Sequence, residues 1–145
     1  MTYVIGVVGQ TSKSFSMEEE VWEAVSAELN RIGYGKKDVM VLGGLTDTPS
    51  AHRAAYILAR HKGWKIGGIA CEKAHGHKWF PMSNDGDVLN IVGKTWGDEV
   101  QDFVDRVDIL VRVGGGTPAS KFVDYANEKG LPVVEVRLEP RKVYV

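Results

Sequence analysis

Three glycine-containing turns have the composition of anion-binding loops, and each follows a short apolar run. They cover residues 9–14, 43–49 and 114–120, and the last two lead from adjacent glycines into Thr-Pro. Glycine permits positive φ and keeps side chains away from a group that lies against the backbone. A helix that begins after such a turn directs free N–H groups and its positive dipole end at the turn. This composition favours a phosphate, a carboxylate or a sugar hydroxyl as the ligand.

The candidate ligand-binding residues are those of the turns themselves. They are Gly9, Gln10, Thr11, Ser12, Lys13, Gly43, Gly44, Gly114, Gly115, Gly116, Thr117 and Ser120. We expect Thr117 to cap the last helix and Pro118 to be its first residue, since these residue types favour those positions. The alternative is that glycine serves only the sterics of each turn and that Lys13 is simply solvated. One such turn alone does not decide between the two interpretations.

Two common nucleotide-binding fingerprints do not fit the first turn. Lys13-Ser14 matches the end of a Walker A motif, but Val7 and Ser12 stand where its glycines belong. The same loop lacks the G-x-G-x-x-G of dinucleotide-binding proteins. We therefore expect neither a P-loop nor an NAD site, and no resident cofactor.

A loose group of metal-ligand residue types follows the third predicted strand. It consists of Cys71, Glu72, His75 and His77. His-x-His suits a metal, but alternate residues on a loop need not converge, and solvated histidines explain the pattern as well. We expect no metal site.

Aromatic and acidic residues near the fourth predicted strand also have two interpretations. Trp79, Phe80 and Trp96 either stack on a base or cover the core beneath a long loop. Asp98 is explained by a helix cap with Gln101, while Asp98 or Glu99 as a catalytic carboxylate is the functional alternative.

The elements that position these residues alternate between strands and helices. Apolar runs predict strands, and apolar residues at every third or fourth position predict helices. We expect strands over residues 3–8, 38–42, 65–71, 88–92, 108–113 and 132–138. We expect helices that begin at the caps Ser16, Thr48, Asp98 and Thr117 and end by Gly33, Gly63, Val107 and Gly130. This order predicts an α/β fold, a Rossmann-like three-layer α/β/α arrangement with a mostly parallel sheet.

The predicted sheet brings the three turns together. Ligands of such sheets lie beyond the carboxyl ends of the strands, and each turn follows a strand at that edge. We therefore expect the turns to converge on one anion- or nucleotide-binding cleft. The segment 72–87 is expected to be a long loop, of a length that is usually functional or mobile.

Length and composition are typical of one soluble domain. The chain has 145 residues, of which 43% are hydrophobic and 26% charged, and its net charge is −1. We expect a single domain over residues 1–145. The near-neutral charge does not favour nucleic acid or an anionic membrane as a partner. One cysteine, no signal peptide and no apolar run of membrane-spanning length favour a cytoplasmic protein.

Three stretches of the chain carry a family resemblance through their order and spacing. They are residues 4–9; residues 41–44 with Ala54, Ala55, Ala59 and residues 63–69; and residues 107–111 with 114–117 and 130–134. Together they resemble the LOG/SLOG superfamily of Rossmann-like proteins, which includes the "lonely guy" phosphoribohydrolases, the lysine-decarboxylase-like proteins and the DprA/Smf-related group. The resemblance implies a nucleotide or ribosyl-phosphate ligand and a homodimer.

The chain departs from the superfamily's hydrolases at the residues that carry their chemistry. Those enzymes read P-G-G-x-G-T-x-x-E and have an Arg-Lys pair on the preceding helix. Here Val113 replaces the proline, one residue is missing between the glycines, and Ser120 stands in place of the glutamate. The helix over residues 100–106 lacks the pair. The resemblance implies that the glutamate helps to ionise the ribosyl–base bond, and a serine cannot supply that charge.

The sequence therefore favours a domain that binds a nucleotide or ribosyl phosphate without the family's hydrolytic chemistry. The alternative is a phosphoribohydrolase, or another enzyme of N-glycosidic bonds, in which Glu72, Asp98 or Glu99 replaces the absent glutamate. A third possibility is a structural protein whose glycine turns are only turns.

Overall fold

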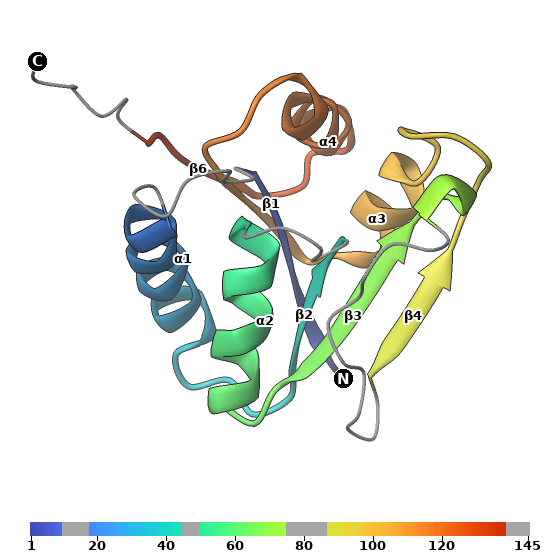
Figure 1. Ribbon diagram of the computed structural model, residues 1–145. Coiled ribbons are helices and arrows are strands. Elements are labelled where there is room, and N and C mark those ends of the chain that lie inside the picture. The colour runs from blue at the N-terminus through green and yellow to red at the C-terminus, as the bar shows by residue number, and fades with distance from the viewer. Residues whose placement is uncertain (10–17, 45–49, 75–86, 139–145) are drawn as a thin grey trace, which may run out of the picture.

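The computed structural model describes residues 1–9, 18–44, 50–74 and 87–138. Within them, six strands form one sheet whose neighbouring strands are all parallel, in the order β4-β3-β2-β1-β5-β6 (Figure 1). The strands are β1 (Tyr3–Gly9), β2 (Val39–Gly43), β3 (Lys65–Ala70), β4 (Val88–Ile91), β5 (Ile109–Val113) and β6 (Val133–Val136). The helices are α1 (Glu18–Gly33), α2 (Ala51–His61), α3 (Val100–Arg106) and α4 (Thr117–Lys129), with a short 3-10 helix, η2 (Glu72–Ala74).

The helices cover the two faces of the sheet in pairs. Helices α1 and α2 pack together on one face, and α3 and α4 pack on the other (Figure 1). Successive side chains of a strand point to opposite faces, so β1 contributes Ile5 and Val7 to the α1/α2 core and Val8 to the α3/α4 core. The expected three-layer α/β/α fold is confirmed.

The strand order changes direction between β1 and β5. From β1 the chain proceeds outward through β2, β3 and β4, and then returns to the opposite side of β1 as β5. Gly9 at the end of β1 lies in register with Val113 at the end of β5. Because β1 is followed by α1 on one face of the sheet and β5 by α4 on the other, a crevice is expected at their carboxyl ends, where open α/β sheets bind ligands.

Three predicted helix caps differ from the structure. Helix α2 begins at Ala51, and its N-cap is Ser50, whose Oγ accepts the Arg53 N–H at 3.1 Å, so Thr48 is not the cap. Helix α4 begins at Thr117 with Gly116 as N-cap, which makes Pro118 the second residue rather than the first. In both helices the N-cap is a neighbour of the Thr-Pro pair rather than its threonine: Ser50 for α2 and Gly116 for α4.

The third difference concerns Asp98. The N-cap of α3 is Glu99, and Asp98 lies in the preceding turn. The predicted end of α4 is confirmed, since Gly130 is its C-cap with a φ of +73°. Ser16, the expected cap of α1, lies outside the described residues, and so does most of the expected loop over 72–87.

A buried tyrosine joins α2 to the ends of two strands. Tyr56 is fully buried, and its hydroxyl donates to the Gly67 carbonyl oxygen at 2.8 Å, with the Gly44 carbonyl oxygen 3.1 Å away. The same hydroxyl accepts the N–H of Gly43. A Cβ on Gly43 would lie 2.8 Å from this oxygen, so glycine here is required for the packing of α2. Burial raises the pKa of Tyr56 far above its ordinary value.

We predict that Tyr56→Phe lowers the free energy of unfolding by about 1–2 kcal/mol, because buried backbone groups lose their partner. Since the unfolded chain ionises this phenol near pH 10 while the folded chain keeps it neutral, wild-type stability falls as pH rises above about 10. The variant lacks this contribution, so the difference between the two proteins shrinks in alkali. Urea unfolding at neutral and alkaline pH measures both effects. A difference that is independent of pH would contradict the assignment.

Candidate functional site

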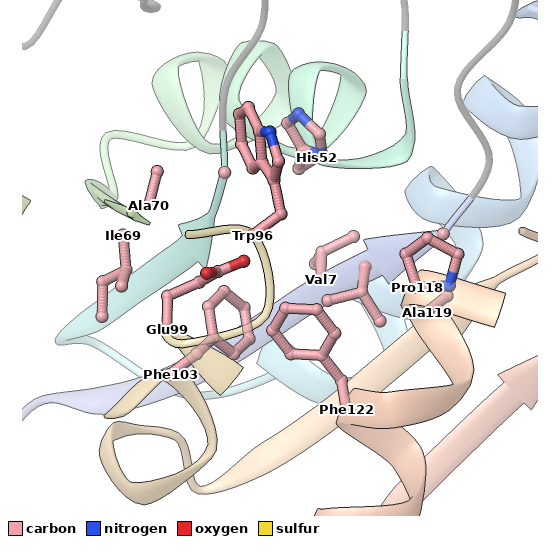
Figure 2. Close-up of a pocket in the computed structure, with 13 residues that line it drawn as sticks. Val7, His52, Ile69, Ala70, Trp96, Glu99, Phe103, Pro118, Ala119 and Phe122 are labelled. Carbon is pink, nitrogen blue, oxygen red and sulfur yellow. The ribbon is translucent and has the colours of Figure 1, made fainter. Parts of the chain in front are cut away.

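A cavity of about 290 Å³ lies at the carboxyl ends of β1, β2 and β3. The beginnings of α2 and α4 and the turn before α3 complete its walls (Figure 2). Its lining residues are Val7, Val8, Gly9, Gly44, His52, Ile69, Ala70, Trp96, Glu99, Phe103, Pro118, Ala119 and Phe122. The cavity therefore borders the crevice that the change in strand order predicts, through Gly9 at the end of β1 and through the start of α4, which follows β5.

The walls of this cavity are mostly apolar and aromatic. Phe103 and Phe122 form one wall, where their rings meet edge to face with centroids 5.0 Å apart. Figure 2 shows Trp96 and His52 at the opposite side, with the Glu99 carboxylate directed into the space between. Trp96 is 51% exposed, which is unusual for an indole and leaves its ring accessible. A flat apolar ring has suitable surfaces to contact here.

The turn that carries Trp96 and Glu99 is held by the side chain of Asp98. Its Oδ2 accepts the N–H groups of Lys94 at 2.9 Å and Thr95 at 3.0 Å. These two donors lower the pKa of Asp98, because they stabilise the ionised carboxylate. Glu99 accepts the N–H of Gly97 at 3.1 Å through Oε2. Asp98 therefore shapes the turn, while Glu99 lines the cavity.

The glycine turn after β5 is explained in large part by sterics. Gly114 and Gly115 have φ values of +62° and +87°, which L-residues with side chains rarely adopt. A Cβ on Gly115 would lie 2.9 Å from the carbonyl carbon of Gly9, so the two loops touch through bare backbone. Gly9 is equally constrained, because its Cβ would lie 2.1 Å from the Val113 carbonyl oxygen.

Two glycines at the site have no such explanation. Gly116 has a φ of −113° and open space where a Cβ would point. A Cβ on Gly44 would meet only the Ile69 carbonyl oxygen, at 4.0 Å, and Gly44 is not among the residues with positive φ. The packing of the described residues requires glycine at neither of these two positions. A ligand that approaches the backbone closely would require it.

Arg112 orients the peptide groups of the glycine turn. Its guanidinium donates to three successive carbonyl oxygens, at 3.0 Å for Gly114, 3.2 Å for Gly115 and 3.3 Å for Gly116. It also lies 3.5 Å from Glu135 Oε1, its neighbour across β6. In a trans peptide the N–H of the next residue points opposite to the carbonyl. The N–H groups of residues 115–117 are therefore turned away from Arg112.

The N–H groups of Gly116 and Thr117 lie at the start of α4, which is suited to an anion. Its first N–H groups have no partner within the helix, and its first turn contains no acidic residue. A second cavity of about 300 Å³ adjoins this helix end. It shares Trp96, Glu99, Pro118 and Phe122 with the first cavity and adds, among others, Thr117 and Lys121.

The predicted site residues are distributed as follows. Gly9 and Gly44 line the first cavity, and Thr117 lines the second. Gly114 and Gly115 line a separate hollow beside Arg112 and β6. Gly43, Gly116 and Ser120 line none of these three, and the Ser120 hydroxyl donates to the Gly116 carbonyl oxygen at 3.3 Å. Gln10, Thr11, Ser12 and Lys13 lie outside the described residues. As ligand contacts, all twelve residues stay predictions.

The structure adds residues that sequence reasoning missed. Arg112 is the clearest case, since it lies inside the predicted strand and was interpreted only as part of it. His52 and Phe122 were missed because each lies in a helix whose pattern indicates only packing. A charged residue at the penultimate position of an apolar strand, as Arg112 is, was the one available signal.

The potential metal ligands and aromatic residues at positions 71–80 are described only in part. Cys71 is buried and Glu72 is exposed, while His75, His77, Trp79 and Phe80 lie outside the described residues. No group of three or more potential metal ligands occurs in the part of the chain that the structure describes. None of the helices described there is long and apolar enough to cross a membrane.

The comparisons with known proteins are informative at the level of structure. Neither a scan against protein-family models nor a search of curated proteins finds a match. The molybdenum cofactor binding protein from the phototrophic bacterium Rippkaea orientalis has a TM-score of 0.70 at 16% identity, over 96% of this chain and 78% of that one. The molybdenum cofactor carrier protein from Chlamydomonas reinhardtii has a TM-score of 0.67 at 18% identity, over 97% and 80%. The structural-genomics protein TM1055 has a TM-score of 0.66 at 18% identity, over 90% and 72%.

The chain has the LOG/SLOG Rossmann-like fold. The resemblance that three short stretches indicated is thus confirmed as a likeness of folds. The third of these stretches leads from β5 into α4, and the cavity adjoins the start of α4.

We predict that Asp98→Asn destabilises the protein at neutral pH, because a neutral amide is a weaker acceptor for the two N–H groups than a carboxylate. The pKa of Asp98 is lowered on folding, so its contribution is present above the ordinary pKa and is lost as pH falls through the folded value. The stability difference between wild type and variant should therefore close in acid. Urea unfolding at neutral pH and at about pH 2 measures it. An equal difference at both pH values would show that Asp98 acts in another way.

Proposed function

We propose that this domain binds a small molecule with a phosphate group and a flat heterocyclic ring, and that it does not hydrolyse it. The observation that carries the proposal is Gly116. It lies at the N-terminus of α4, and no described atom lies within 4 Å of the position that its Cβ would take. A phosphate that rests against bare backbone at a helix N-terminus requires one.

The arrangement of the turn supports the phosphate end. Arg112 holds the carbonyl oxygens of residues 114–116 on its own side, so the following N–H groups face away from it. N–H groups fixed in this way bind an anion without first having to reorganise. Thr117 adds a hydroxyl and Lys121 a positive charge at the adjoining cavity.

The apolar cavity supports the ring end. It is lined by Trp96, Phe103 and Phe122 and borders the same helix end. Two of the solved structures with this fold belong to proteins named for binding or carrying a small molecule, the molybdenum cofactor. A nucleotide, the ligand that the sequence favours, has both a phosphate and a flat ring.

Absence of hydrolysis follows from the residues near the helix end. Ser120 replaces the glutamate of the superfamily's hydrolases, and its hydroxyl bonds to the helix's own Gly116 carbonyl. We further propose that the loop containing residues 10–13 completes the phosphate site, that the protein is a homodimer and that it resides in the cytoplasm.

We predict that Gly116→Ala weakens the binding of nucleoside 5′-monophosphates about tenfold or more, because the new methyl group occupies the space of the phosphate and prevents N–H contacts. Stability should fall by about 1 kcal/mol or less, since alanine is only a poorer N-cap than glycine. Isothermal titration calorimetry and thermal unfolding measure the two effects. Unchanged affinity would place the phosphate elsewhere.

Gly130→Ala is the matched control for this variant. Gly130 is at the other end of the same helix, with open space around its Cβ position and a φ of +73°. This substitution should cost about 1 kcal/mol or more through backbone strain. Nucleotide affinity should stay at the wild-type value, which would show that lost helix stability alone does not weaken binding.

A second candidate function is favoured by one observation. Of the three carboxylates proposed as substitutes for the missing glutamate, Glu99 lines the cavity, whereas Asp98 holds its own turn and Glu72 is exposed. A carboxylate beside a bound ribosyl group can stabilise a developing positive charge. An enzyme of N-glycosidic bonds that uses Glu99 is therefore the alternative.

We predict that the wild-type protein releases neither free base nor ribose 5-phosphate from nucleoside 5′-monophosphates, as followed by chromatography over hours. The reason is that no acidic residue occupies the first turn of α4, where the hydrolases have theirs. Steady release that disappears in Glu99→Gln and persists in the control Glu72→Gln would overturn this prediction and establish the alternative function.

A further inference from the structure

Glu99 introduces a charge into a cavity that is otherwise apolar apart from His52. Among the described lining residues it is the one acidic side chain, and it lies with Trp96, Phe103 and Phe122. Figure 2 shows its carboxylate directed toward the other labelled side chains that line the cavity. One of its oxygens, Oε2, already accepts the N–H of Gly97 at 3.1 Å, which holds the side chain in place.

A ligand ring that fills this cavity displaces the water around the carboxylate. An ionised carboxylate that loses its water without gaining hydrogen-bond donors is strongly destabilised. The lining residues offer little compensation, because most of them are aliphatic or aromatic. The ring must therefore bring N–H donors of its own to Glu99.

The shape of a carboxylate indicates which rings can do so. Its two oxygens accept two parallel N–H groups, as in pairs with guanidinium groups. A 2-amino-4-oxo ring, such as guanine or a pterin, presents a ring N–H and an amino N–H side by side on one edge. Adenine presents an unprotonated ring nitrogen beside its amino group, and that nitrogen would face the carboxylate lone pairs.

We propose that Glu99 determines ring specificity and that the site selects 2-amino-4-oxo heterocycles over adenine-type rings. This inference rests on the proposed function, since it assumes a phosphate at the start of α4. Glu99 and α4 border both cavities, so one ligand can reach the helix end with its phosphate and Glu99 with its ring.

The test compares GMP, IMP and AMP, which share the ribose phosphate and differ at the ring edge. We expect GMP to bind at least roughly tenfold more tightly than AMP, the effect of one or two hydrogen bonds to a charged group. IMP, with the ring N–H but no amino group, should be intermediate. Calorimetric titration of the wild-type protein gives all three affinities.

The variant Glu99→Gln tests whether this residue is responsible. Glutamine keeps the size of the side chain and can still accept the Gly97 N–H, so the turn is preserved. Its amide has one acceptor oxygen where the carboxylate has two, so it cannot accept two parallel N–H groups on separate oxygens, and the preference for GMP over AMP should fall to less than about threefold. Glu72→Gln, which changes an exposed carboxylate outside the cavity, should keep the full preference.

The outcomes separate this inference from the proposed function. Equal affinities for GMP, IMP and AMP in the wild-type protein would overturn the role of Glu99 while the phosphate site stands. A preference for GMP that survives Glu99→Gln would also overturn it. If none of the three nucleotides binds, and inorganic phosphate does not bind either, then the proposed function fails and this inference fails with it.

Discussion

The site depends on a contact between two stretches of bare backbone. A Cβ on Gly115, in the turn after β5, would lie 2.9 Å from the carbonyl carbon of Gly9, and a Cβ on Gly9, at the end of β1, would lie 2.1 Å from the Val113 carbonyl oxygen. A larger residue at either position would push the end of β1 and the turn after β5 apart. Their contact sets where α4 begins relative to the sheet. The position of the helix N-terminus, and hence of the proposed phosphate, follows from this steric constraint.

Arg112 orients the peptide groups of the turn after β5. Its guanidinium donates to three carbonyl oxygens of the turn, and because each peptide group is planar, the directions of the N–H groups that follow them are fixed as well. The strand that supplies Arg112 is central and the opposite carboxylate of Glu135 lies on the edge strand. One side of the turn is thus satisfied internally, and we propose that the N–H groups of Gly116 and Thr117 on the other side meet a ligand.

Much of the fold was predictable because it depends on local patterns. Apolar runs identified every described strand to within one or two residues, and the order of elements then required a parallel sheet. Helix caps were less predictable, since Ser50 and Thr48 are both good caps and only tertiary packing selects one.

The location of the candidate site was predictable from the sequence, but many of the residues that line it were not. The glycine turns could be read from the sequence, whereas Arg112, His52 and Phe122 contribute through contacts between distant elements.

The two ends of the proposed site have opposite electrostatic character. The start of α4 favours negative charge, whereas Glu99 repels it and attracts N–H donors. A ligand with a phosphate at one end and a donor-rich ring edge at the other satisfies both ends in only one orientation. A simple anion satisfies one end and leaves the carboxylate without a partner. The same carboxylate that raises the question of catalysis is therefore better explained as the group that orients a polar ligand in an apolar cavity.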